Sequence, residues 1–137
     1  MKVSNLVFFT IVFLVSFNSC TYPVRLYTGP ELPSREIAKL HCGSEVRIHA
    51  FDGGEFILQG ESPKYFEILP GHHSVTVVYL GSGRGEYKYG VNPITLKFDA
   101  KPGHKYRIEC DVHWLNEKEG RWQAWIEDKT TGEIIGK

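Results

Sequence analysis

Histidines and cysteines are the residues of this sequence that could support metal binding or nucleophilic catalysis; it has six of the former and three of the latter. His72 and His73 are adjacent at a predicted turn, and neighbouring side chains of a strand point to opposite faces, so they make a poor ligand pair. The sequence has no His-x-x-x-His spacing on a predicted helix and no paired Cys-x-x-Cys motif,. We therefore expect no metal site, and we expect His72 and His104 to hydrogen-bond backbone carbonyls at corners of the fold.

Serine, cysteine and carboxylate chemistry also lacks a recognisable arrangement. Ser74 and Ser82 stand outside a Gly-x-Ser-x-Gly motif,. Cys42 directly follows His41, but adjacent residues of a strand diverge and cannot form a thiol–imidazole pair. The sequence therefore predicts no catalytic residue, no enzyme and no cofactor. The alternative is a small metal- or cysteine-dependent hydrolase of the periplasm that uses the histidines.

Two of the cysteines, Cys42 and Cys110, have the strand parity of residues that face one core. Cys110 alternates with polar residues in the run "HKYRIECDVHW", and Cys42 joins the same face if its strand begins early enough. A disulfide bond between them would contribute about 2–4 kcal/mol by closing a long loop. The alternative is a pair of buried thiols, because Cα atoms more than about 7 Å apart cannot be bridged.

Aromatic side chains supply the candidate binding surface. Trp122 and Trp125 have opposite strand parity, so one of them should face outward,. Tyr87 and Tyr89 lie in a glycine-rich segment at residues 81–92 that is suited to touching a partner,. We name Tyr87, Tyr89 and Trp125 as candidate partner-binding residues for an envelope protein or a cell-wall glycan. The alternative is that the aromatics only fill the core.

The elements that must position these residues are short strands. Alternation of apolar and polar residues is clear at residues 45–51, 94–99 and 105–114,. Turn signals such as "DGG", "LPG" and "KPG" separate such runs by 8–12 residues,. About eight short strands with this spacing predict an all-β sandwich or barrel. Basic and acidic residues balance at 16 each, and no basic stripe is present, so nucleic acid is not an expected partner.

The N-terminus predicts export. The apolar run at residues 6–17 is shorter than the roughly 20 residues that span a membrane, and it fits the apolar centre of a secretory signal,. The following "FNSC" resembles the lipobox of bacterial lipoproteins, in which the signal is cut before a cysteine that then carries lipid. This implies a signal peptide at residues 1–19 and lipidation of Cys20. The alternative is a secreted β module without lipid.

Domain boundaries follow from the same features. After Cys20, three prolines within residues 20–35 predict an extended tether, and residues 36–137 are expected to form one β domain,. Thr21 stands where an Asp would favour the inner membrane in many bacterial lipoproteins. By this resemblance we expect attachment to the outer membrane, with the domain facing the periplasm.

Several stretches resemble a family of small, uncharacterised bacterial lipoproteins: "YTGPELPSREIAKL", "LPGHHSVTVVY", "PGHKYRI" and "WIEDKTTGEII". The "LPGHHSVTV" stretch also resembles the PEGA domain, a small β module of bacterial surface proteins. The resemblance implies a small antiparallel β-sandwich of roughly seven to eight strands, transthyretin-like or immunoglobulin-like, and no reaction. The expected function is therefore a non-catalytic binding or structural module held at the membrane by its lipid.

Overall fold

The fold is all-β throughout the part of the chain that the computed structural model describes, which comprises residues 22–56, 63–81, 92–115 and 120–137. These residues form ten strands and no helix. The strands are β1 (Val24–Arg25), β2 (Ala38–Cys42), β3 (Val46–Phe51), β4 (Gly54–Glu55), β5 (Tyr65–Ile68), β6 (Gly71–Tyr79), β7 (Ile94–Ala100), β8 (Lys105–Trp114), β9 (Gly120–Asp128) and β10 (Ile134–Gly136).

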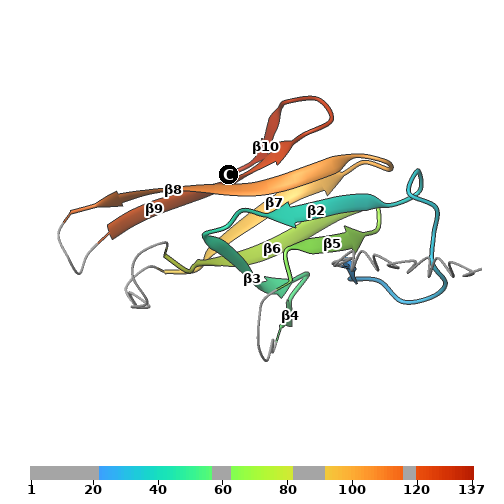
Figure 1. Cartoon of the computed structure of the whole chain (residues 1–137), viewed down its shortest axis with the longest axis horizontal. Helices are drawn as coiled ribbons and strands as arrows, with labels where there is room; N and C mark the ends of the chain where they lie inside the picture. Colours follow the sequence, from blue (N-terminus) through green and yellow to red (C-terminus); the bar gives the residue numbers. More distant parts are fainter. Residues whose placement is uncertain (1–21, 57–62, 82–91, 116–119) are drawn as a thin grey trace, which may run out of the picture.

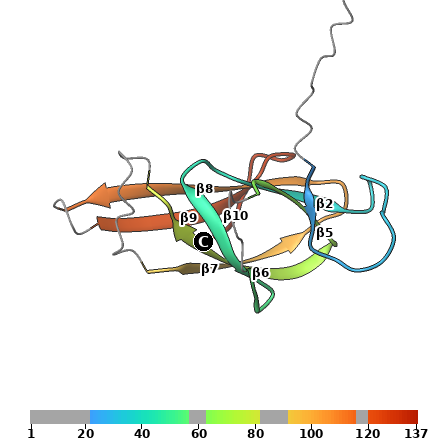
Figure 2. The same cartoon turned by 60° about the horizontal axis from the view of Figure 1, so that its bottom comes forward.

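The strands make two sheets that face each other like the layers of a sandwich (Figures 1 and 2). One sheet has the order β1-β5-β2-β8-β9-β10 and the other the order β4-β3-β6-β7. The prediction of an all-β, sandwich-like fold is confirmed. The expectation of seven or eight antiparallel strands is wrong, because there are ten strands and the β1–β5 and β2–β8 pairs are parallel. Periodicity along one strand reports which face is buried, but it does not report the direction of the neighbouring strand.

The inner faces of both sheets form one apolar core. In β7 and β8 the alternation read from the sequence is confirmed, because Leu96, Phe98, Tyr106 and Ile108 are buried while their polar neighbours are more exposed. Each fully buried side chain of this size contributes about 1.5–3 kcal/mol through removal from water. Because the inward side chains are held in this core, the side chains that alternate with them are held on the outward face of each sheet.

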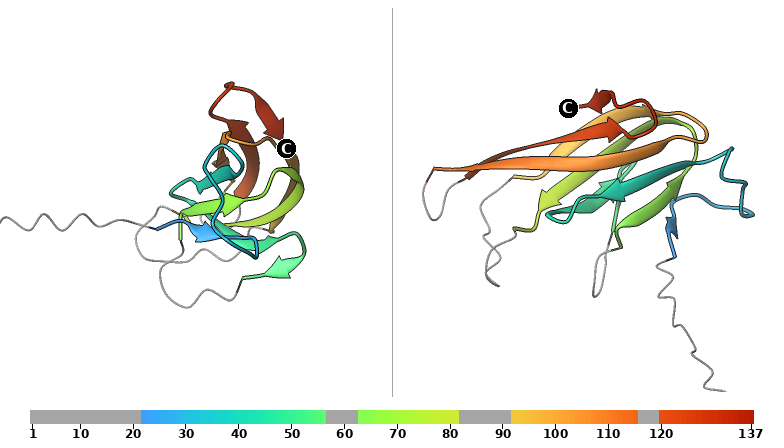
Figure 3. Two further views of the ribbon diagram at one scale, coloured as in Figure 1. Left: turned by 90° about the vertical axis from the view of Figure 1, so that its right-hand side faces the viewer. Right: turned by 45° about the horizontal axis from the view of Figure 1, so that its top comes forward.

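The tether is partly a strand of the domain. β1 pairs in parallel with β5, and the Leu26 amide donates to the Glu67 carbonyl at 2.9 Å. Val24 and Leu26 pack against the core. The expected boundary at residue 36 therefore excludes a strand that belongs to the sheet, as Figure 3 shows for the blue segment beside β5. Residues 1–21, with the predicted signal and Cys20, lie outside the described residues.

The β3–β4 turn has the geometry that its "DGG" sequence predicts. Asp52 and Gly53 have φ values of +47° and +81°, as a tight hairpin turn requires,. The Asp52 carboxylate accepts a hydrogen bond from the Ser74 amide at 2.8 Å, so the turn is tied to β6.

Candidate functional site

Three histidines are paired with aspartates. The expectation that His72 and His104 bond backbone carbonyls is wrong, because strand register brings a carboxylate to each ring. The contacts are His72 Nδ1–Asp99 Oδ1 at 3.0 Å, His73 Nδ1–Asp52 Oδ2 at 2.6 Å and His104 Nδ1–Asp128 Oδ2 at 2.7 Å.

His73 is held from both sides. Its Nε2 lies 2.6 Å from the Leu69 carbonyl oxygen, while its Nδ1 faces Asp52. Both ring nitrogens therefore face oxygen atoms of the protein, and neither is free to contact another molecule. The Asp52–His73 contact therefore ties the β3–β4 turn to β6.

Asp128 is a buried carboxylate with three donors. It is 2% exposed and accepts from His104 and from the backbone amides of Thr130 and Thr131. Burial raises the pKa of Asp128, but the hydrogen bonds from His104 and from the two amides outweigh it, so the pKa is lowered overall. Among the described residues, no group of three or more His, Cys, Asp and Glu could hold a metal ion.

Cys42 and Cys110 both face the core, as their parity predicts. Cys42 is in register with Ile108 on β8, so Cys110 is its diagonal neighbour. Diagonal neighbours are typically about 7–8 Å apart, beyond the Cα separation that a disulfide bond bridges, and both thiols are free in the structure. Burial raises the pKa of Cys42 to about 12. Burial, and then the charge of Glu45, raises that of Cys110 to about 11.

Trp125 lies on the outward face of β9, whereas Trp122 packs against the core, so the opposite-parity prediction is confirmed. Trp125 is half-buried and lines a groove of about 440 Å³ where β9 and β10 approach the start of β7. The groove is lined by Ile94, Trp122, Gln123, Ala124, Trp125, Ile134 and Lys137. Tyr87 and Tyr89, the other candidate partner-binding residues, lie outside the described residues.

In the part of the chain that the structure describes, one edge of β9 has no paired strand beside this groove. β10 pairs only with Ile126 and Glu127. The Lys129 amide donates to a carbonyl of β8, whereas the Asp128 amide donates in the opposite direction, to the Glu133 carbonyl before β10. Backbone groups alternate in direction along a strand, so the amides and carbonyls of Trp122 and Ala124 point away from β8, as those of Asp128 do. No backbone partner for these groups occurs in the described part of the chain. Within the described residues, the result is a short sheet edge without a neighbouring strand.

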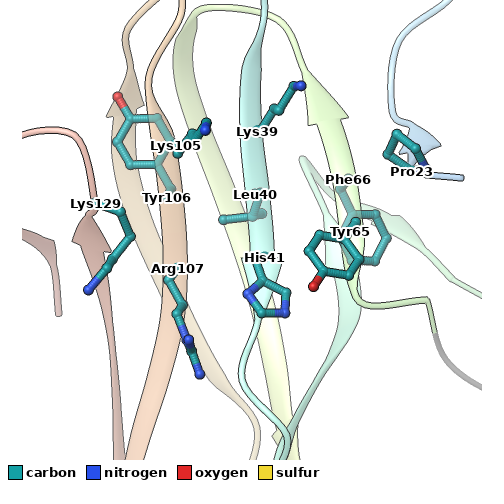
Figure 4. Close-up of a pocket in the computed structure, with 10 residues that line it drawn as sticks. All are labelled: Pro23, Lys39, Leu40, His41, Tyr65, Phe66, Lys105, Tyr106, Arg107 and Lys129. Atoms are coloured by element: carbon teal, nitrogen blue, oxygen red, sulfur yellow. The ribbon is translucent and has the colours of Figure 1, made fainter. Parts of the chain in front are cut away.

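A second groove, of about 470 Å³, lies on the outward face of the six-stranded sheet (Figure 4). The His41 and Tyr65 rings stack there with centroids 4.3 Å apart and planes 2° from parallel. Figure 4 shows Lys39, Lys105, Arg107 and Lys129 above these rings and to one side of them, and together with the rings they belong to what we call the cationic groove. It is lined by Pro23, Lys39, Leu40, His41, Tyr65, Phe66, Lys105, Tyr106, Arg107 and Lys129.

The cations of this groove come from separate strands that register places side by side. Lys39 of β2 is directly opposite Lys105 of β8, and His41 is opposite Arg107. Burial, and then the charge of Arg107, lowers the pKa of His41. Sequence analysis missed this site. The sequence signal for it was the basic residues Lys39, Lys105 and Arg107 at outward-facing strand positions. Their proximity, however, depends on the parallel β2–β8 pairing.

Two of the cations have acidic partners. Lys129 Nζ lies 2.9 Å from Glu127 Oε1. Arg107 Nε lies 2.5 Å from Glu109 Oε1, but outside hydrogen-bond geometry, so this contact is an ion pair alone.

No helix long and apolar enough to cross the membrane is present among the described residues. No family model matches the chain, and comparison with curated proteins and with solved structures gives no match.

Proposed function

We propose that this chain is a lipid-anchored protein of the bacterial envelope whose β-sandwich is a non-catalytic binding module. The apolar run at residues 6–17 and the lipobox-like "FNSC" support export and attachment through Cys20, and Thr21 in place of an Asp supports the outer membrane as the destination. The "LPGHHSVTV" turn and strand support a PEGA-like or transthyretin-like relationship for the sandwich. The domain would then face the periplasm.

The observation that carries the binding role is the open edge of β9. The backbone groups of Trp122 and Ala124 point into the groove that Trp125, Ile94 and Ile134 line. An added strand satisfies such groups by main-chain hydrogen bonds, while apolar side chains on either side give specificity. The partner that fits is an extended segment of an envelope protein. A cell-wall glycan fits less well, because Trp125 is half-buried rather than a flat exposed platform.

The state of the polar groups supports a role without catalysis. Both nitrogens of His73 are engaged. The thiols of Cys42 and Cys110, with pKa values of about 12 and about 11, are protonated at neutral pH and so are poor nucleophiles,. A metal- or cysteine-dependent hydrolase is therefore the less favoured function.

The test is site-specific photo-crosslinking in cells followed by binding in solution. A photoreactive residue at Gln123 should capture one envelope protein through a short contiguous segment, whereas one at Arg47 on the four-stranded sheet should not. The captured segment, made as a peptide, should slow hydrogen exchange at the amides of Trp122 and Ala124 and leave the Arg47 amide unchanged. Equal capture at both positions, capture of glycan, or unchanged exchange would contradict the strand-binding role.

The anchor is tested separately. The mass of the mature N-terminus should correspond to an acylated Cys20, and Cys20→Ser should release the chain from membranes. An unmodified Cys20 on a chain that washes from envelopes would indicate the secreted form without lipid.

A further inference from the structure

We infer that the cationic groove docks on anionic phospholipid headgroups of the membrane that carries the chain, so that the sheet lies against the bilayer. This inference rests on the proposed anchor at Cys20. It concerns a surface distinct from the open edge of β9, because the cationic groove and the groove at that edge share no lining residue.

The charges of the groove favour an anionic occupant. Lys39 and Lys105 are direct cross-strand neighbours, and like charges in this position repel each other,. Glu67 is in register with Lys39 on its other side, but in the described part of the chain neither lysine forms an ion pair. A phosphate group placed between the two ammonium groups would convert this repulsion into attraction.

The apolar part of the groove favours a membrane over a free anion. Tyr65 is 47% exposed and stacks on His41, and Pro23 lines the groove beside them. Tyrosine rings are enriched at the headgroup level of bilayers, and lysines can lay their alkyl stems on apolar surface while their ammonium groups reach phosphates. Stacked aromatic rings flanked by lysines therefore match the headgroup region of a bilayer, which presents phosphates beside the start of the acyl chains.

The position of the anchor keeps one edge of the groove close to the membrane. Pro23 lines the groove and is three residues from Cys20. Three residues span at most about 11 Å when fully extended. An acylated Cys20 sits at the membrane interface, so Pro23, at the β1 edge of the groove, is held within about 11 Å of the headgroups. Rotation about this tether can bring the charges on β2 and β8 within a Debye length, about 8–10 Å, of the headgroups. Charges at that distance are not fully screened by physiological salt.

The test measures lysine accessibility in the complete mature chain reconstituted into vesicles. One vesicle contains phosphatidylcholine only, and the other contains phosphatidylcholine and phosphatidylglycerol at three to one. Acetylation of Lys39 and Lys105, measured by mass spectrometry, should be at least about fivefold slower on the anionic vesicles, since each lysine near such a surface gains about that factor in binding. Lys97, on β7 of the other sheet, is the internal control and should react equally on both. The protection should disappear at high salt.

A matched pair of variants tests whether the lysines cause the docking. In Lys39→Gln/Lys105→Gln, Lys129 should lose its protection on anionic vesicles, because the surface that holds it there is weakened. In Arg47→Gln/Lys97→Gln, which removes two charges from the other sheet, Lys129 should stay protected. Equal reactivity of Lys39 and Lys105 on the two vesicle types would overturn the inference. Equal protection by inorganic phosphate without vesicles would also overturn it, in favour of a free anion.

Failure of the anchor and failure of the docking give different results. The N-terminal mass reports the anchor alone. If Cys20 proves unmodified, the same chain is sedimented with the two vesicle types. Binding to the anionic vesicles only would retain the docking surface while the anchor is rejected, and binding to neither would reject both.

Discussion

The Nδ1 atom of His104 lies 2.7 Å from Oδ2 of Asp128, and this contact joins the residue before β8 to the last residue of β9. The other carboxylate oxygen of Asp128 holds the amides of Thr130 and Thr131. The Lys129 amide then donates to the Lys105 carbonyl at 2.7 Å. One buried carboxylate thus determines the corner that carries two cations of the groove.

Replacement of Asp128 by Asn should destabilise the fold by about 1.5–3 kcal/mol, because a buried, charge-assisted set of hydrogen bonds becomes a neutral and incomplete one. The measurement is urea denaturation at pH 7. Asp111→Asn, at an exposed position of the same β8–β9 hairpin, is the control and should change the free energy of unfolding by less than about 0.5 kcal/mol. Equal effects of the two substitutions would contradict the role of the His104–Asp128 contact.

The same carboxylate predicts a loss of stability in acid. The pKa of Asp128 in the folded chain lies below its ordinary value of 3.8. The folded state therefore favours the charged form, and its stabilising contribution is present above about pH 4 and lost as the pH falls through the folded value. Urea midpoints measured from pH 6 to pH 3 should show the difference between the native chain and Asp128→Asn narrowing towards the acid end. A constant difference across this range would contradict the assignment.

His41 is predicted to titrate below 6.5, because burial and then the charge of Arg107 lower its pKa. Arg107→Gln should raise the pKa of His41 part of the way to 6.5, since the effect of burial remains. The His41 ring proton resonance, followed by NMR against pH, measures this directly. Arg121→Gln, at the far end of the outward face of β9, should leave the titration unchanged. A fall in pKa after Arg107→Gln would show that the arginine has another effect.

The two core thiols should be nearly inert in the folded chain. Burial raises the pKa of Cys42 to about 12, and burial with Glu45 raises that of Cys110 to about 11, so thiolate is scarce at pH 8,. Peptide mass spectrometry after brief treatment with iodoacetamide should find Cys42 unmodified and Cys110 modified slowly. Both should react fully in denaturant. Recovery of a Cys42–Cys110 disulfide from the native chain would require the two strands to shift, and would contradict the register described here.

Local features of the fold could be predicted because each depends on neighbouring residues. The alternation of Ile94, Leu96 and Phe98 determines which face of β7 is buried, and the Asp52-Gly53 pair determines a turn with positive φ. The strand parity of Cys42 and Cys110 likewise predicted that both face the core, as they do.

Features that depend on which strands meet could not be predicted. Nothing around Lys39 indicates that Lys105, far along the chain, is its cross-strand neighbour in a parallel pair. The same reason explains why His104 was expected to bond a carbonyl at its own turn instead of Asp128. The β1 strand was missed because two residues, Val24 and Arg25, are too few for a period to be read.

Asp52 gives a last prediction that separates charge from backbone conformation. Its φ is +47°, a value that Asn tolerates much better than Ala,. Asp52→Asn should keep the turn and an acceptor for the Ser74 amide but lose the charged partner of His73. Asp52→Ala loses both contacts and strains the backbone. The free energy of unfolding measured by urea denaturation should therefore be highest for the native chain, lower for Asp52→Asn and lowest for Asp52→Ala. The Asp52→Ala value should lie about 2–4 kcal/mol below that of the native chain. Equal losses in the two variants would mean that the turn conformation and the Ser74 hydrogen bond contribute nothing beyond the contact with His73.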